Sequence, residues 1–102
     1  MQKTIYETIK EWIKLKSVNG RLRFAGHIIQ TGIPGYGQVE FGVLHTPDSY
    51  SRAWRRIRET KMFEPEIIIS EEDGTGIGKK EKYYIVEWRV GQLNEVSANT
   101  NN

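Results

Sequence analysis

The sequence predicts an α+β domain in which three helices precede a C-terminal two-stranded β-hairpin. Two observations carry this prediction. Amphipathic segments with capping signals span residues 4–16 and 47–60, and a β-branched run at 66–70 is followed, after a glycine-rich stretch, by an alternating segment at 81–89. Since 102 residues suit a single domain, we expect one domain over residues 1–91 and a polar, disordered tail over residues 92–102.

The first helix is expected over residues 4–16. Thr4 and Glu7 have the spacing of a capping box, in which each side chain accepts a hydrogen bond from the other's backbone amide. The segment 17–20 ends in glycine, a typical signal for the end of a helix. The predicted core-facing residues recur at helical spacing and are Ile5, Ile9, Trp12, Ile13 and the stem of Lys16.

The segment between the first helix and residue 45 predicts less regular structure. Residues 21–24 alternate polar and apolar side chains as a short strand does, and residues 25–31 predict a short helix. Residues 32–37 are so rich in Gly and Pro that we expect a loop, with Tyr36 either exposed or folded over the core. Residues 38–44 fit a strand or an extended connector equally well.

The helix over residues 47–60 has the clearest local signal in the chain. Thr46 suits the N-cap, and Pro47 suits the first helical position, where its missing N–H is not needed. At about 100° per residue, one face of this helix is apolar and the opposite face is polar and mostly basic. The apolar face holds Tyr50, Ala53, Trp54 and Ile57; the opposite face holds Asp48, Arg52, Arg55, Arg56 and Glu59.

The C-terminal part of the domain predicts a β-hairpin. Residues 66–70 form the first strand, residues 71–80 a glycine-rich tip, and residues 81–89 the returning strand. Alternation along the returning strand separates its side chains onto two faces. One face holds Tyr84, Val86 and Trp88, and the other holds Tyr83, Ile85 and Glu87.

This order of elements over residues 4–89 resembles the winged helix-turn-helix superfamily. The resemblance rests on the capped basic segment 46–58 and on the glycine-tipped hairpin after it. It implies that the third helix enters the major groove and that the hairpin, the wing, lies along the DNA backbone or minor groove. The usual turn between the second and third helices has three or four residues, whereas residues 32–45 separate the two predicted here. The turn therefore carries an insertion, or the second helix lies elsewhere.

The basic helix supplies the predicted DNA-binding residues. Its cations between residues 52 and 58 are all arginine, whose planar guanidinium suits guanine edges and phosphates. We expect base contacts from Arg52, Arg55 and Arg56; the alternative is that these arginines only solvate the outer face. The predicted set also includes residues for backbone phosphates, from both ends of the helix and from the wing: Ser49, Ser51, Arg58, Lys79 and Lys80.

We therefore expect a DNA-binding protein, a transcriptional regulator whose partner is double-stranded DNA and which works as a homodimer. One alternative is a protein-interaction module whose arginines face an acidic or nucleic-acid-processing partner. Another is a single-strand binder that stacks bases on Tyr83, Tyr84 or Trp88.

Other function classes lack the residues they need. The chain has no cysteine, so disulfides and thiolate metal sites are excluded, and we expect a cytoplasmic protein. Neither His27 nor His45 has a second ligand at metal-binding spacing, and no nucleophile motif occurs, so we expect no metal, no small-molecule cofactor and no enzymatic activity. No run of about 18 apolar residues occurs, which predicts no membrane-spanning helix.

Overall fold

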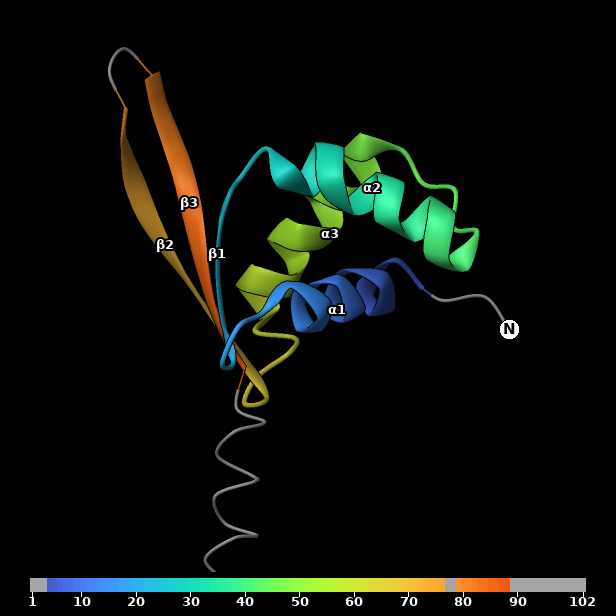
Figure 1. Cartoon of the computed structure of the whole chain (residues 1–102), viewed down its shortest axis with the longest axis horizontal. Coiled ribbons are helices and arrows are strands. Elements are labelled where there is room, and N and C mark those ends of the chain that lie inside the picture. The colour runs from blue at the N-terminus through green and yellow to red at the C-terminus, as the bar shows by residue number, and fades with distance from the viewer. Residues whose placement is uncertain (1–3, 77–78, 89–102) are drawn as a thin grey trace, which may run out of the picture.

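A computed structural model describes residues 4–76 and 79–88 as three helices packed on one face of a small antiparallel sheet (Figure 1). The predicted α+β class with three helices is confirmed, but the sheet has three strands where two were expected. The predicted tail, residues 92–102, lies outside the described residues. The elements are α1 (Ile5–Lys16), β1 (Arg21–Ala25), α2 (Ile28–Phe41), α3 (Pro47–Thr60), β2 (Ile67–Gly76) and β3 (Lys79–Trp88).

The strand β1 is the reason that the sheet has three strands. The order is β1-β3-β2, so the predicted strand at residues 21–24 pairs with the free side of β3. Phe24 lies opposite Tyr84, and Leu22 lies opposite Val86, on the face toward the helices. Because β1 has five residues and the hairpin strands have ten each, β2 and β3 continue past the end of β1 (Figure 1).

The hairpin strands are longer than predicted. The segment 71–80 was expected to be the tip, but β2 runs to Gly76 and β3 begins at Lys79. Gly74 pairs with Glu81, and Gly76 pairs with Lys79. Cross-strand backbone hydrogen bonds thus keep these glycines extended, although glycine is unfavourable in strands when taken alone.

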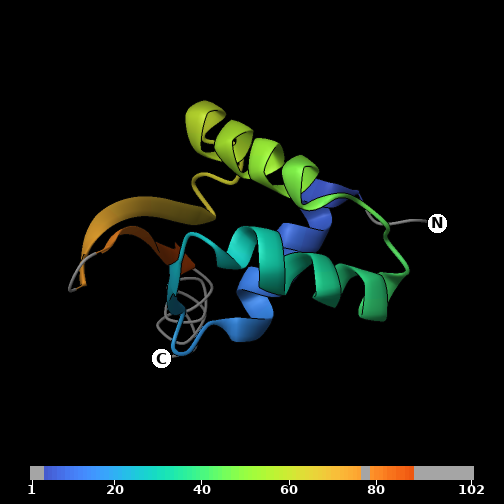
Figure 2. The same ribbon diagram turned by 90° about the horizontal axis from the view of Figure 1, so that it is seen from above.

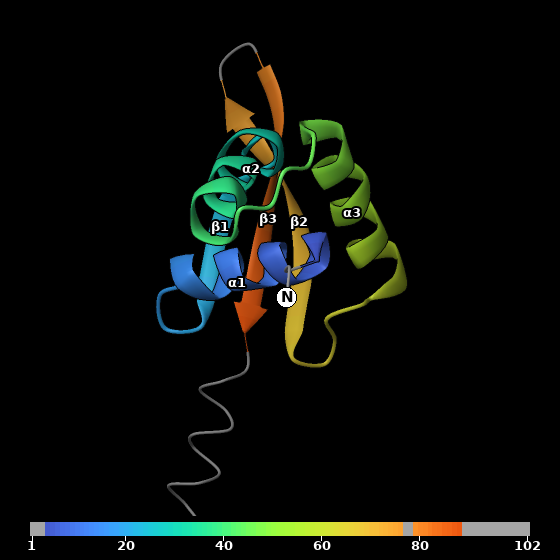
Figure 3. The same cartoon turned by 90° about the vertical axis from the view of Figure 1, so that its right-hand side faces the viewer.

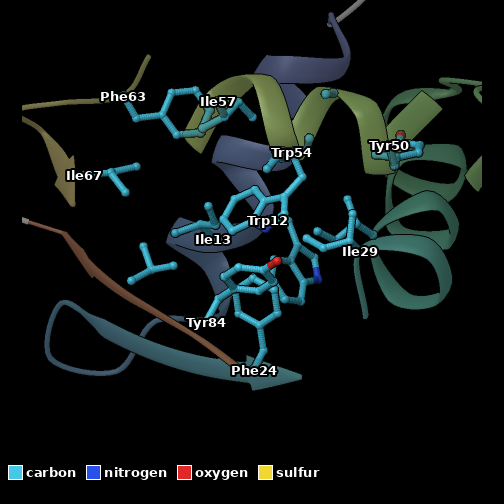
Figure 4. Packing of buried hydrophobic residues seen from close by; sticks show 14 residues of the cluster. Trp12, Ile13, Phe24, Ile29, Tyr50, Trp54, Ile57, Phe63, Ile67 and Tyr84 are labelled. Atoms are coloured by element: carbon cyan, nitrogen blue, oxygen red, sulfur yellow. The ribbon is translucent and has the colours of Figure 1, made fainter. Parts of the chain in front are cut away.

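Four aromatic rings hold the helices to the sheet (Figure 4). The ring of Trp12 in α1 meets Phe24 of β1 edge-on, with 5.1 Å between centroids. Trp54 of α3 meets Tyr84 of β3 edge-on at 5.2 Å and lies 5.6 Å from Phe24. All four side chains are buried, so this cluster fixes how α1 and α3 lie on the sheet.

The helix α1 follows its sequence signals. The capping box is present, because the Glu7 amide donates to Thr4 Oγ1 at 3.1 Å and the Thr4 amide donates to Glu7 Oε1 at 2.9 Å. The predicted stripe is confirmed at Ile9, Trp12 and Ile13, all of which are buried, whereas Ile5 is half-buried. The stem of Lys16 was expected on the same stripe, but Lys16 is exposed because it lies at the end of the helix.

The structure confirms a helix at residues 28–31 and overturns the prediction for residues 32–41. The short helix predicted at 25–31, the loop at 32–37 and the extended segment at 38–44 give way to one helix, α2, which includes Pro34 and ends at Phe41. Ile29, Ile33 and Gly37 are buried and recur every fourth residue, which is helical spacing. Burial of this stripe outweighs the weak helix propensity of Gly and Pro.

The connection between the second and third helices is also shorter than predicted, because α2 extends to Phe41. Five residues, from Gly42 to Thr46, separate Phe41 from Pro47, in place of the fourteen expected at 32–45. Gly42 has φ 66°, a left-handed conformation that glycine adopts readily, and it ends α2. Tyr36 is half-buried within α2, and its ring packs edge-on against Phe41 at 5.5 Å.

Gly37 lies where α2 packs closely against its two neighbouring helices. A Cβ at Gly37 would lie 2.6 Å from the Tyr50 hydroxyl of α3 and 2.9 Å from Thr8 Cγ2 of α1. Both side chains are fully buried and have little room to move. Only glycine therefore fits at this position without a shift of the helices.

We predict that Gly37→Ala lowers the free energy of unfolding by about 1–3 kcal/mol, because the added methyl overpacks the helix contact. The matched control is Gly35→Ala in the same helix, where a Cβ would meet nothing within 4 Å. That change should raise the free energy by about 0.5–1 kcal/mol through helix propensity. Chemical denaturation measures both, and a destabilising Gly35→Ala would contradict the helix.

Two lysines of α1 bind Glu66, the residue before β2. Lys10 Nζ lies 2.6 Å from Glu66 Oε1, and Lys14 Nζ lies 3.1 Å from Glu66 Oε2. The hydrogen bond from Lys10 is the main cause that lowers the pKa of the Glu66 carboxyl, against a smaller opposing effect of burial. These contacts tie α1 to the beginning of the hairpin.

The lowered pKa predicts a pH-dependent stability. In the unfolded chain a glutamate has a pKa of about 4.3. The contribution of Glu66 to the free energy of unfolding is therefore complete above that pH, and it is lost as the pH falls through the lower pKa of the folded state. At pH 7, Glu66→Gln should reduce the free energy of unfolding by up to about 1 kcal/mol, and the difference from the parent should vanish in acid. The exposed Glu64→Gln is the control and should follow the parent at every pH.

Candidate nucleic-acid interface

The helix α3 is capped and oriented as its sequence predicts. The Ser49 amide donates to Thr46 Oγ1 at 3.1 Å, and Pro47 occupies the first turn. The predicted stripe of Tyr50, Ala53, Trp54 and Ile57 is buried. In Figure 2, α3 runs along one side of the molecule with no other element outside it, so the face opposite this stripe is open to a partner.

Arg52, Arg55 and Arg56 lie on this outer face, and all three side chains are exposed. Among the side chains that the structure describes, no carboxylate forms an ion pair with any of them. Asp48 and Glu59 are on the same helix, but neither of these two carboxylates is paired with the three guanidinium groups. Three positive charges are therefore available for a ligand outside the chain.

Several other cations are already paired within the protein. Arg23 Nη2 lies 2.7 Å from Glu72 Oε1, and its guanidinium lies over the Tyr83 ring at 4.1 Å. Lys82 Nζ lies 3.1 Å from Glu71 Oε1. In each pair a carboxylate of β2 offsets the positive charge of the cation.

Arg58 differs from the other arginines of α3. It is half-buried, its guanidinium lies 5.0 Å from the centre of the Tyr84 ring, and its Nη1 lies 3.4 Å from Glu71 Oε1. Arg58 therefore joins α3 to the hairpin. Arg58 lies on the flank of α3, and its positive charge is partly offset by the carboxylate of Glu71.

The remaining predicted site residues are spread over three places. Ser49 is half-buried, and its hydroxyl lies 2.9 Å from that of Thr46, within the helix cap. Ser51 is half-buried in the first half of α3. Lys79 and Lys80 open β3, and their side chains lie outside the described part of the chain.

A shallow, open depression of about 480 Å³ lies beside α3, where α1 begins. Sequence reasoning missed Tyr6 and His45, which line it, because neither carries a local signal of binding. Tyr6 is half-buried on α1, and the His45 ring meets Tyr50 edge-on at 6.0 Å. The complete lining is Ile5, Tyr6, His45, Ser49, Arg52, Ala53, Arg55 and Arg56.

The aromatic residues considered for base stacking are engaged within the protein. Tyr84 is buried in the core, and the Tyr83 ring is covered by Arg23. Trp88 is half-buried with the Lys14 ammonium 5.2 Å from its ring centre. The three rings therefore do not form an open stacking surface.

Comparison with protein-family models, with curated proteins and with solved structures found no match for this chain. In the described part of the chain, no three His, Asp or Glu side chains group as metal ligands would. No described helix has the length and apolar character needed to cross a membrane.

We predict that Arg58 contributes to folding whereas Arg55 does not. Arg58→Ala removes the contacts with Tyr84 and Glu71 and should lower the free energy of unfolding by about 1 kcal/mol. Arg55→Ala, an equal change of charge on the same helix, should stay within about 0.5 kcal/mol of the parent. Equal denaturation midpoints for the two variants would show that the Arg58 contacts add nothing.

Proposed function

We propose that this protein binds double-stranded DNA as a transcriptional regulator, with α3 in the major groove. The observation that carries the proposal is the set of three exposed arginines, Arg52, Arg55 and Arg56, which have no carboxylate partner among the described residues. If these side chains only kept the protein soluble, lysine would serve as well as arginine. The arginine fork adds paired donors that match the guanine edge or a phosphate.

The arrangement of the elements supports the same proposal. The major groove of DNA admits one α-helix, and α3 presents its arginine face away from the rest of the fold. The order of elements is compatible with a winged helix-turn-helix, and the five-residue connection before α3 is close to the turn of that motif. In such an arrangement, β2 and β3 would be the wing, with Lys79 and Lys80 near its end.

A homodimer extends the proposal, because two copies of α3 could occupy two half-sites on palindromic DNA. One copy offers a single helix, which limits the area that it can bury against DNA. Sedimentation of the protein with and without DNA would detect the second copy.

The direct test is fluorescence anisotropy of labelled duplex DNA titrated with protein over a series of salt concentrations, with single strands in parallel. We expect preference for duplex and a linear fall of log affinity with log salt, because bound cations release counterions. Arg52→Ala, Arg55→Ala or Arg56→Ala should each cost about 1–3 kcal/mol of binding. Lys16→Ala, which removes an exposed cation from the end of α1, should leave binding unchanged.

Sequence selection from a random duplex library separates base reading from backbone contact. Replacing an arginine that reads a base should relax preference at one base pair, whereas replacing one that contacts phosphate should weaken all duplexes alike. Absence of binding to any duplex at low salt would contradict the proposal. Tight binding of an acidic protein in its place would favour the interaction-module alternative.

A further inference from the structure

The two flanks of α3 differ in their electrostatic character. On the hairpin flank, Arg58 and Lys82 share the carboxylate of Glu71. This carboxylate offsets part of the positive charge among the described side chains of the flank. A DNA phosphate would have to compete with Glu71 for these cations.

The depression on the α1 flank carries only positive formal charge. Its described lining includes three arginines and no carboxylate. Tyr6 and Ser49 bring hydroxyl groups, His45 brings an imidazole, and Ile5 and Ala53 add apolar surface. These residues come from α1, from the connection before α3 and from α3 itself, so the fold gathers them at one place.

We propose that this depression binds a phosphodiester of the DNA strand, so that the strand backbone crosses the α1 flank of α3 and not the described hairpin flank. The inference rests on the proposed function and names a site within it. It assigns backbone-binding roles to Tyr6, His45 and Arg56, of which the first two lie outside the basic helix.

The chemistry of the lining fits a phosphodiester. A guanidinium donates paired N–H groups to phosphate oxygens, and such charge-assisted hydrogen bonds are stronger than neutral ones. The Tyr6 hydroxyl can donate to the same group, while Ile5 and Ala53 provide apolar contact for the adjoining sugars. A contact to phosphate positions the strand without reading its sequence.

The first test compares the two flanks by the salt dependence of duplex binding. Arg56→Gln should reduce the slope of log affinity against log salt by about one unit. Tyr6→Phe keeps the ring and should weaken binding by about three- to tenfold, equally for preferred and random duplexes. The matched controls are Lys82→Gln on the hairpin flank and Arg23→Gln on the face of the sheet away from the helices. Each removes a cation already paired with a glutamate, and both should keep the parent slope.

Thermal melting of every variant checks that the fold is retained. The inference is overturned where folded Arg56→Gln and Tyr6→Phe bind all duplexes as the parent does. It is also overturned if the loss of slope appears in the two control variants and not in Arg56→Gln.

The second test does not depend on duplex binding. In an NMR titration with a thymidine dinucleotide, which holds one phosphodiester, we expect amide shifts at His45, Ser49 and Arg56, with weaker binding in Tyr6→Phe. Absence of these shifts overturns the inference even where duplex binds. If the dinucleotide bound at this depression but no duplex bound, the result would contradict the proposed function and still support a phosphodiester site.

Discussion

The contact of Trp54 with Tyr84 and Phe24 is the constraint on which the rest of the arrangement depends. It joins α3, the helix with the exposed arginines, to two strands of the sheet through buried rings, edge-on at Tyr84 and tilted at Phe24. Trp12 extends the same cluster into α1. Figure 3 shows the outcome, with α1 crossing in front of the sheet and α3 at its side. Because α1 and α3 share this anchor, Tyr6 and the arginines come to lie around one depression.

The close approach of α2 is the second constraint, and it depends on the absence of a side chain. Gly37 brings the backbone of α2 within contact distance of Tyr50 and Thr8, so that α2 packs against both other helices. A glycine-rich segment that weakens an isolated helix thus allows this helix to pack. The position of α3 then depends on the sheet on one side and on Gly37 on the other.

Charge is distributed unevenly over this framework. Glutamates of β2 and of the residue before it bind Lys10, Lys14, Arg23, Arg58 and Lys82, and they tie the hairpin to α1, α3 and β1. The arginines on the outer face of α3 are left out of this network. The net charge of the chain is only +2, so the distribution of charge over the surface carries more information than the total.

Local signals in the sequence determined α1 and α3, because a capping box, a Thr-Pro start and a helical stripe act within a few residues of one another. They also determined that Arg52, Arg55 and Arg56 face away from the core. Tertiary structure alone decided the length of α2, the pairing of β1 with β3 and the depression. Each of these depends on partners distant in the sequence: Gly37 on Tyr50, β1 on β3, and Tyr6 on the arginines of α3. Free energy gained from burial across such contacts outweighs the local propensity of the residues involved, and a local pattern contains no information about it.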